Sequence, residues 1–240
     1  MNRATFLTTF KHSVVVAALV GLLAGLLLTL IQQLQVVPLI AEAERYEQTA
    51  VNAKHDDHQH DSASASSHHE HTQGAWHPEQ GWERNLYTAG ANIVVAFGFA
   101  LLVGSATTLR GAQLSWRSGL LWGLGGYVTF FVAPSFGLPP DLPGTEAASL
   151  LSRQTWWVTA AFATASGLWL LVFARRHVSK IVGVAVLVMP HVVGAPQPEI
   201  VISTAPDELA KAFVIATTIA NAVFWLSLGG LYGLLQGRKN

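Results

Sequence analysis

Long apolar stretches constrain the fold of this chain more than any other feature. Six mostly apolar segments follow one another along its 240 residues, at 13–34, 88–109, 116–136, 155–174, 181–195 and 210–235. A helix that crosses the hydrocarbon core of a bilayer needs about 20 such residues. The composition agrees, because 12% of the residues are charged, against about 25% in a soluble domain. The sequence therefore predicts an all-α membrane protein with six transmembrane helices.

The first and fifth segments need separate interpretation. Residues 181–195 are few for a crossing helix and include Pro190 and His191. If this segment re-enters the membrane instead of crossing it, five transmembrane helices remain. The first segment is longer than the apolar core of a signal peptide, which has about 7–15 residues. It also runs into a glutamine-rich stretch instead of a cleavage site, so we interpret it as an uncleaved signal anchor.

The charged residues indicate how the chain is oriented. With a cytoplasmic N-terminus and six crossings, nine of the 14 lysines and arginines fall in cytoplasmic segments, in agreement with the positive-inside rule. All 14 aspartates and glutamates fall in outer segments. We therefore expect a protein of the bacterial inner membrane with both termini in the cytoplasm. Three parts follow: a tail and first helix (1–34), a periplasmic loop (35–87) and a bundle of about five helices (88–240).

The predicted periplasmic loop is rich in histidine and acidic residues. Its centre reads KHDDHQHDSASASSHHEHTQGAWHPE, which has too few apolar residues to bury a core, so we expect it to be disordered. Neutral imidazole binds Zn, Cu, Ni, Co and Fe, and carboxylates add oxygen ligands. The tract predicts a flexible collector of divalent metal ions whose candidate ligands are His55, His58, His60, His68, His69, His71 and His77.

Two further polar signals lie next to the apolar segments. Glu42, Glu44 and Glu47 follow the first segment; they would cluster at the outer mouth of the bundle if the helix continued past Pro38. Solvated acids on a surface helix are the alternative. His191 lies in PHVVGAP near the outer end of the fifth segment, and an ionisable side chain in a membrane segment is a candidate functional residue. We predict that all four side chains bind the metal; the alternative for His191 is a hydrogen-bonded core histidine.

Small residues and tryptophans suggest how the helices pack. Glycine pairs separated by four positions let helix backbones approach closely, and three such pairs occur: Gly21/Gly25, Gly119/Gly123 and Gly229/Gly233. We expect them to pack helices of this chain together, with a face for a partner as the alternative. Trp156 and Trp157 lie at the start of the fourth segment, where tryptophan commonly anchors a helix at the membrane interface.

The chain lacks residues that several other functions need. It contains no cysteine, which excludes disulfides and thiolate metal sites. Its net charge is 0 and it has no basic stripe, so nucleic acid is not an expected partner. The motifs H-E-x-x-H, G-x-S-x-G and the P-loop are absent from the sequence. We expect neither an enzyme nor a resident cofactor; the metal ion would be cargo.

Several stretches together resemble the CbtA-type cobalt transporter subunits: AGLLLTLIQQLQVVPLIAEAERYE, the His-rich insert, GWERNLYTAGANI, SGLLWGLGGYVTFFVAPSFGLPPDLPGTEAASL, SRQTWW, PHVVGAPQPE and TIANAVFWLSLGGLYG. They span nearly the whole chain in order. The resemblance implies Co²⁺ import linked to cobalamin synthesis, and a small single-span CbtB-type partner with its own histidine motif. That family is usually described with about five spans. The residues leave one alternative open, a metal receptor or delivery subunit that hands the ion to another permease.

Overall fold

The computed structural model describes residues 3–57, 81–111, 114–200 and 203–237. Its helices, in chain order, are α1 (Arg3–Ile31), the π-helical turn η1 (Gln32–Val36), α2 (Val37–Asp57), α3 (Trp82–Arg110), α4 (Trp116–Tyr127), the π-helical turn η3 (Val128–Val132), α5 (Ala133–Ser135), α6 (Leu150–Phe173), α7 (His177–Val193) and α8 (Asp207–Gly237). Within these ranges the only strand-like pairing is a bridge between Thr145 and Ser203. The predicted all-α class is confirmed.

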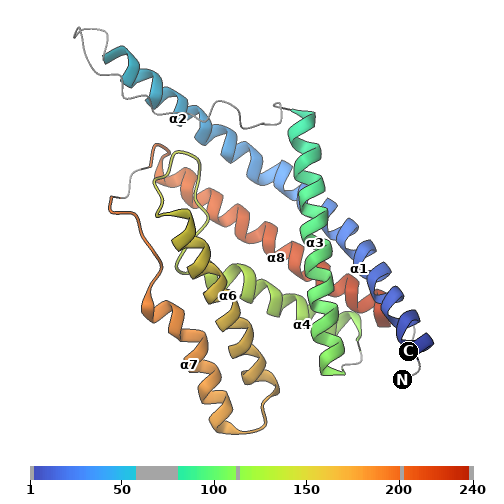
Figure 1. The fold of residues 1–240 in the computed structure, drawn as a ribbon. Helices are drawn as coiled ribbons and strands as arrows, with labels where there is room; N and C mark the ends of the chain where they lie inside the picture. The colour runs from blue at the N-terminus through green and yellow to red at the C-terminus, as the bar shows by residue number, and fades with distance from the viewer. Residues whose placement is uncertain (1–2, 58–80, 112–113, 201–202, 238–240) are drawn as a thin grey trace.

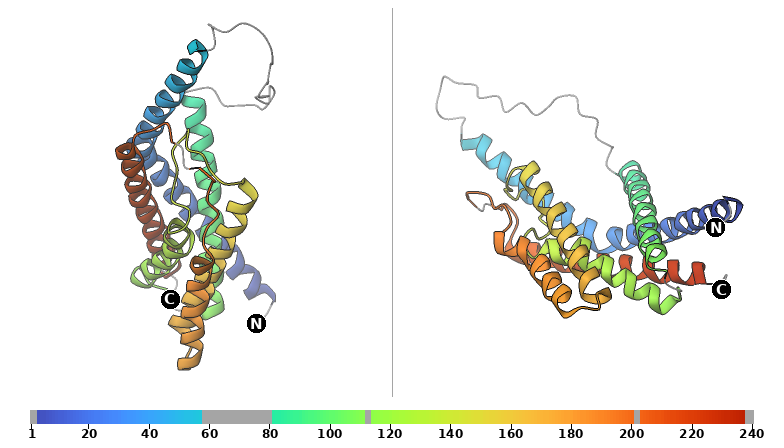
Figure 2. Two further views of the ribbon diagram at one scale, coloured as in Figure 1. Left: turned by 90° about the vertical axis from the view of Figure 1, so that its left-hand side faces the viewer. Right: turned by 60° about the horizontal axis from the view of Figure 1, so that its bottom comes forward.

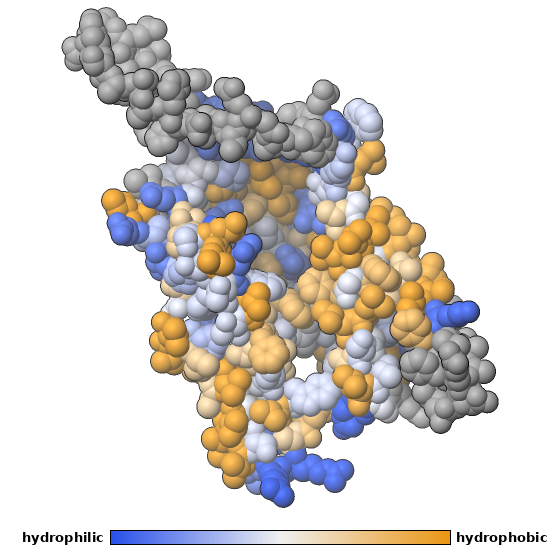
Figure 3. Space-filling view, viewed as in Figure 1, coloured by the Kyte–Doolittle hydropathy of each residue, from blue (hydrophilic) through white to orange (hydrophobic). Residues whose placement is uncertain are grey.

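Four helices in the described residues are long and apolar enough to cross a membrane: the continuous helix over Phe10–Ala50, α3, α6 and α8. Helix α7 is apolar but has 17 residues, and α4, η3 and α5 form one helix over residues 116–135 that is not among the four. Apolar side chains such as Val94 on α3 and Val192 on α7 point outward, and Figure 3 shows apolar residues gathered over these two helices. Such an exterior suits lipid, so the chain is a multi-pass membrane protein.

Successive long helices alternate in direction (Figures 1 and 2). The start of α1, the end of α3, the turn between α6 and α7 and the end of α8 lie at one end of the molecule. Helix α2 and the starts of α3 and α8 lie toward the opposite end, which we call the outer end.

Glycines bring two pairs of helices to backbone contact. A Cβ atom on Gly25 of α1 would lie 2.6 Å from Cα of Ile93 on α3. A Cβ atom on Gly229 of α8 would lie 2.7 Å from Cα of Gly123 on α4. Both distances are shorter than a van der Waals contact, so only glycine fits. The predicted role of the glycine pairs in packing this chain's own helices is confirmed.

Helices α6 and α7 form an antiparallel hairpin at one side of the bundle (Figure 1). They pack on each other around Gly167 and Gly183. Among the described elements, α6 meets the rest of the bundle through α4, η3 and α5. At the outer end, Leu142 and Ala205 from two irregular segments join the buried core that includes Ala43 of α2.

The first helix does not end near Leu34, where the sequence suggested a boundary. It continues through η1 to Asp57, and α3 begins at Trp82, before the expected Thr88. Pro38 is accommodated inside this continuous helix directly after a π-helical turn, in which Val37 N–H donates to Gln32 O, five residues back. Local π-helical adjustments of this kind accommodate proline in membrane helices.

Candidate functional site

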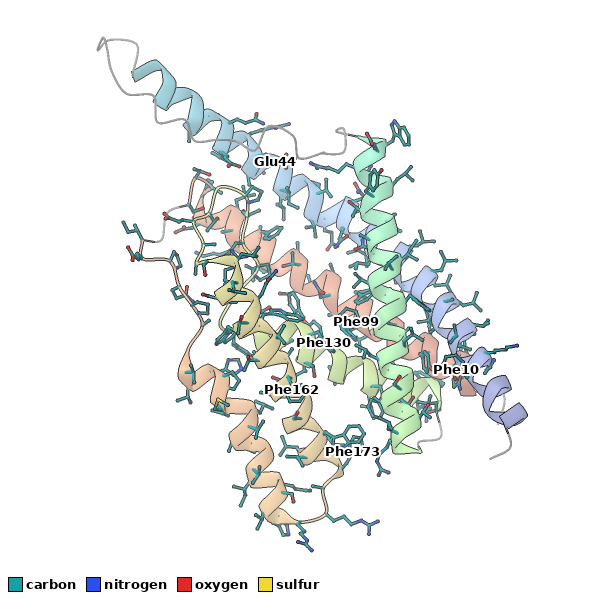
Figure 4. All side chains as sticks on the ribbon, in the orientation of Figure 1. Phe10, Glu44, Phe99, Phe130, Phe162 and Phe173 are labelled. Atoms are coloured by element: carbon teal, nitrogen blue, oxygen red, sulfur yellow. The ribbon has the colours of Figure 1, made fainter. Side chains whose placement is uncertain are left out.

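The three predicted glutamates lie on α2, so the helix does continue past Pro38 as their clustering required. Glu44 Oε1 lies 3.5 Å from Nη1 of Arg84 on α3, at the outer end of the molecule (Figure 4). Glu42 is exposed, and Glu47 is half-buried beside Gly144 of the α5–α6 connection. Glu44 therefore ties α2 to α3, and its charge is partly neutralised by Arg84.

His191 lies in the last turn of α7, at the edge of an open pocket. Its ring meets Trp156 and Phe136 edge-on, with ring centroids 5.8 Å and 6.3 Å away. The pocket has a volume of about 520 Å³ and is lined by Phe136, Gly137, Trp156, His191, Gly194, Ala195 and Gln197. No described residue forms a hydrogen bond with the imidazole. One ring nitrogen of a neutral imidazole carries a free lone pair, and Gln197 is the other polar side chain in this mostly aromatic and apolar lining.

The backbone next to His191 is held by Trp156. The indole Nε1 donates a 3.3 Å hydrogen bond to Pro190 O, which also accepts from Gly194 N at 3.1 Å. Trp156 is only 8% exposed, so it is a buried packing partner of α7 and not the interface anchor that the sequence suggested. No local sequence pattern predicts this bond, because it joins residues 34 positions apart.

The histidine tract falls mostly outside the described residues, from His58 to His77. His55 belongs to the last turn of α2. In the described part of the chain, no group of three or more His, Cys, Asp and Glu side chains is close enough to hold a metal ion. Glu42, Glu44, Glu47 and His191 thus do not form a common ligand set, and their role as ligands stays a prediction.

A polar network that the sequence interpretation missed joins α1, η1 and α3. The amide nitrogen Nδ2 of Asn92 donates to Gln32 Oε1 at 2.7 Å and to Thr29 Oγ1 at 3.0 Å. About two turns farther out along α3, Gln33 Nε2 donates to Asn85 Oδ1 at 2.9 Å. Two sequence signals were available: Asn92 lies inside an apolar segment, and Gln32, Gln33 and Gln35 lie at the end of the first apolar segment.

Aromatic rings from four elements meet near the middle of the bundle. Phe130 of η3 stacks on Trp225 of α8 with ring centroids 5.4 Å apart, and Phe99 of α3 lies 4.6 Å from Trp225. Trp157 of α6 lies 6.3 Å from Phe130. Figure 4 shows Phe99 and Phe130 close together between α3 and α6. We call Phe99, Phe130, Trp157 and Trp225 the aromatic layer.

The polar network lies on the outer side of the aromatic layer. Asn92 precedes Phe99 by seven residues on α3, which corresponds to about 10 Å along a helix. Figure 3 shows that this face of the molecule is hollowed between α3 and α6. The amide and hydroxyl groups of the network therefore lie between the aromatic layer and the outer end, where Glu44 and Arg84 form their ion pair.

The fold and these groups define a helical membrane protein with polar side chains inside its outer half. The sequence profile of the family described as probable cobalt transporter subunit (CbtA) matches residues 10–236. The chain belongs to this family. Because the family is described as a subunit of a transporter, we infer that the complete transporter contains partner subunits. No curated protein and no solved structure matches the chain.

Proposed function

We propose that this chain is the ion-conducting membrane subunit of a cobalt importer in the bacterial inner membrane. The observation that carries the proposal is family membership over residues 10–236. Six crossings with both termini in the cytoplasm agree with the alternating helices and with α1 and α8 meeting at one end (Figure 1). The 17 residues of α7 reach about 26 Å, close to the 30 Å or so of the hydrocarbon core.

The proposed route begins at the histidine tract, which concentrates divalent ions outside the membrane. The acids of α2 then present ligands at the outer end, and the imidazole of His191 presents one at the end of α7. The sequence has no P-loop, but an inward-negative potential suffices for entry. A divalent ion gains about 4.6 kcal/mol per 100 mV, from about 2.3 kcal/mol per unit charge. We further propose a single-span CbtB-type partner and cobalamin synthesis as the consumer of the ion.

The test is the metal content of cells that lack other cobalt importers. This chain is expressed alone and with a CbtB-type partner, and cell-associated Co, Ni, Zn, Mn, Fe and Cu are measured by mass spectrometry. We expect a cobalt-selective rise when both proteins are present. No rise for any metal, with both proteins verified in the membrane, would contradict conduction by this subunit.

Replacement of the seven tract histidines by serine is expected to raise the external Co²⁺ concentration needed for half-maximal uptake by about tenfold. Imidazole and carboxylate ligands bind many divalent metals with little selectivity, so we expect the tract to concentrate ions but not to select or conduct them. The maximal uptake rate should stay unchanged. Initial uptake rates over a range of Co²⁺ concentrations measure both quantities. A maximal rate at background, with normal membrane insertion, would place the tract in the conduction route itself. The tenfold figure corresponds to about 1.4 kcal/mol of lost local binding.

A further inference from the structure

We propose that the open pocket beside His191 binds the metal as a complex with a small organic chelator, and not as a hydrated ion. The imidazole would occupy a coordination position that the chelator leaves open, and the aromatic rings of the pocket would contact the organic part. This inference rests on the proposed function, which supplies the metal, and it names the form in which the cargo is recognised. We call this cavity the His191 pocket; its lining includes the side chains of Phe136, Trp156, His191 and Gln197.

The size of the His191 pocket suits an organic molecule. Its volume is about 520 Å³, within the range of about 300–1,000 Å³ that is usual for small-molecule sites. A divalent ion with a shell of about six waters needs about 180 Å³, since each water takes up about 30 Å³. The pocket is therefore larger than a hydrated ion requires and has room for a chelator around the ion.

Few polar groups of the pocket are free to bind a ligand. The carbonyl of Pro190 accepts a hydrogen bond from Trp156 Nε1 at 3.3 Å, and the carbonyl of Gly137 accepts one from Gln197 Nε2 at 3.2 Å. The N–H groups of the tryptophan and the glutamine are thus engaged with the backbone. Among the described lining side chains, the remaining lone pairs belong to one imidazole nitrogen of His191 and to Gln197 Oε1.

Two such ligands do not replace the water shell of a divalent ion. Transition metals in proteins take about four to six ligands. In the ranges that the structure describes, no three His, Cys, Asp or Glu side chains lie close enough to hold a metal ion. The other ligands must therefore arrive with the ion. Water ligands would find few hydrogen-bond partners against the aromatic wall, and polar groups without partners beside apolar surface are costly.

The aromatic wall favours an organic ligand with a flat ring. Trp156 is buried, but Phe136 is 81% exposed although it lines the pocket, so its ring has free area for contact. Aromatic rings in stacked or edge-on contact gain more than the burial of their area alone provides. A flat aromatic chelator would gain this contact, whereas a hydrated ion would not.

The charge of the pocket favours a neutral complex. No Asp, Glu, Lys or Arg side chain is among the described residues of the lining, so no full negative charge there would balance a bare divalent ion. A dicarboxylate chelator forms an uncharged one-to-one complex with such an ion, which avoids the cost of an unpaired charge beside apolar surface. Because the complex keeps open coordination positions, the tract histidines can still hold it outside the membrane.

The test compares chelators that bind the metal through the same kinds of atom. Dipicolinate and iminodiacetate each offer a nitrogen and a pair of carboxylates, but only dipicolinate contains an aromatic ring. Equilibrium dialysis measures binding of Co²⁺ alone, of each one-to-one Co²⁺ complex and of metal-free dipicolinate. The full chain is used in lipid nanodiscs, with the seven tract histidines replaced by serine in every variant. We expect the Co²⁺–dipicolinate complex to bind about tenfold more tightly than each of the other three, an effect of the size of one aromatic contact.

Two substitutions separate the metal contact from the aromatic contact. His191→Ala is expected to weaken binding of both complexes about tenfold, because the nitrogen ligand is lost. Phe136→Ala should reduce binding of the dipicolinate complex to that of the iminodiacetate complex. The matched control is Phe162→Ala on α6 (Figure 4), since Phe162 is 75% exposed but is not among the lining residues. That variant should bind every form as the parent does.

Equal binding of Co²⁺ alone and of the dipicolinate complex by the parent would overturn the proposal. A preference for dipicolinate that persists in Phe136→Ala, or a loss that is as large in Phe162→Ala, would overturn it too. Absence of binding by either complex, as expected of a pocket filled by lipid, would also contradict it. If the complex binds in a His191-dependent way but cells gain no cobalt in any form, the pocket stands and the proposed transport function fails. If cells import cobalt and neither complex binds, the transport function stands and the pocket proposal fails.

Discussion

Gly229→Leu is expected to prevent the folded bundle from forming. Position 229 lies where α8 crosses α4, and a Cβ atom there would meet Gly123 N at 2.6 Å and Gly123 Cα at 2.7 Å. These neighbours are backbone atoms, which cannot rotate away as a side chain can. Overpacking a core where side chains can shift costs about 1–3 kcal/mol, and we expect the cost here to exceed that range.

The matched control is Gly125→Leu on α4. The Cβ position of Gly125 has no neighbour within 4 Å, so a leucine there adds bulk without forcing helices apart. Leucine also has a higher helix propensity than glycine. Both variants are compared with the parent by the yield of monodisperse protein in detergent and by thermal unfolding. A Gly229→Leu protein with the parent's unfolding temperature would show that α4 and α8 do not pack as described.

The glycine contacts were predictable because their signal is local. Two small residues four positions apart lie on one face of a helix. The pairs Gly119/Gly123 and Gly229/Gly233 therefore predict that each helix packs closely against another helix, whichever helix that is. Which helices pair is not in that signal. The apolar segments likewise predicted where the helices lie. The observed helices differ from the predicted segments in where they begin and end. Pro38 did not end the first helix, since η1 shifts the hydrogen bonds before it.

The polar network and the bond of Trp156 were not predictable in the same way. Asn92 and Gln32 are 60 residues apart in sequence, and Trp156 and Pro190 are 34 apart. From the sequence alone, Asn92 and Gln32 can be explained as ordinary polar residues of a helix, and Trp156 as an interface anchor. Only the folded structure shows which residue each of them contacts. His191 was singled out by its cost in a membrane segment, but the aromatic pocket around it depends on the α6–α7 pairing.

His191→Ala is expected to lower the maximal rate of Co²⁺ uptake by about tenfold or more, which corresponds to a barrier raised by about 1.4 kcal/mol. The lining of its pocket contains two polar side chains that can offer a lone pair inward, His191 and Gln197. Gln197 donates its amide to Gly137 O at 3.2 Å, so its Oε1 is the remaining acceptor. Removal of the imidazole leaves only that amide oxygen to bind the ion in the pocket, and a borderline ion such as Co²⁺ prefers a nitrogen ligand.

His177→Ala is the control, because His177 is the first residue of the same helix and is exposed. His177 lies at the start of α7, whereas His191 and the pocket lie at its end. We expect that variant to take up Co²⁺ as the parent does, with both variants unfolding at the parent's temperature.

The measurement also separates conduction from metal delivery to another permease. A delivery subunit needs the outer histidine tract but no route through its own helices. Normal uptake by His191→Ala, combined with reduced uptake after replacement of the tract histidines, would therefore favour delivery and contradict a conducting role for His191.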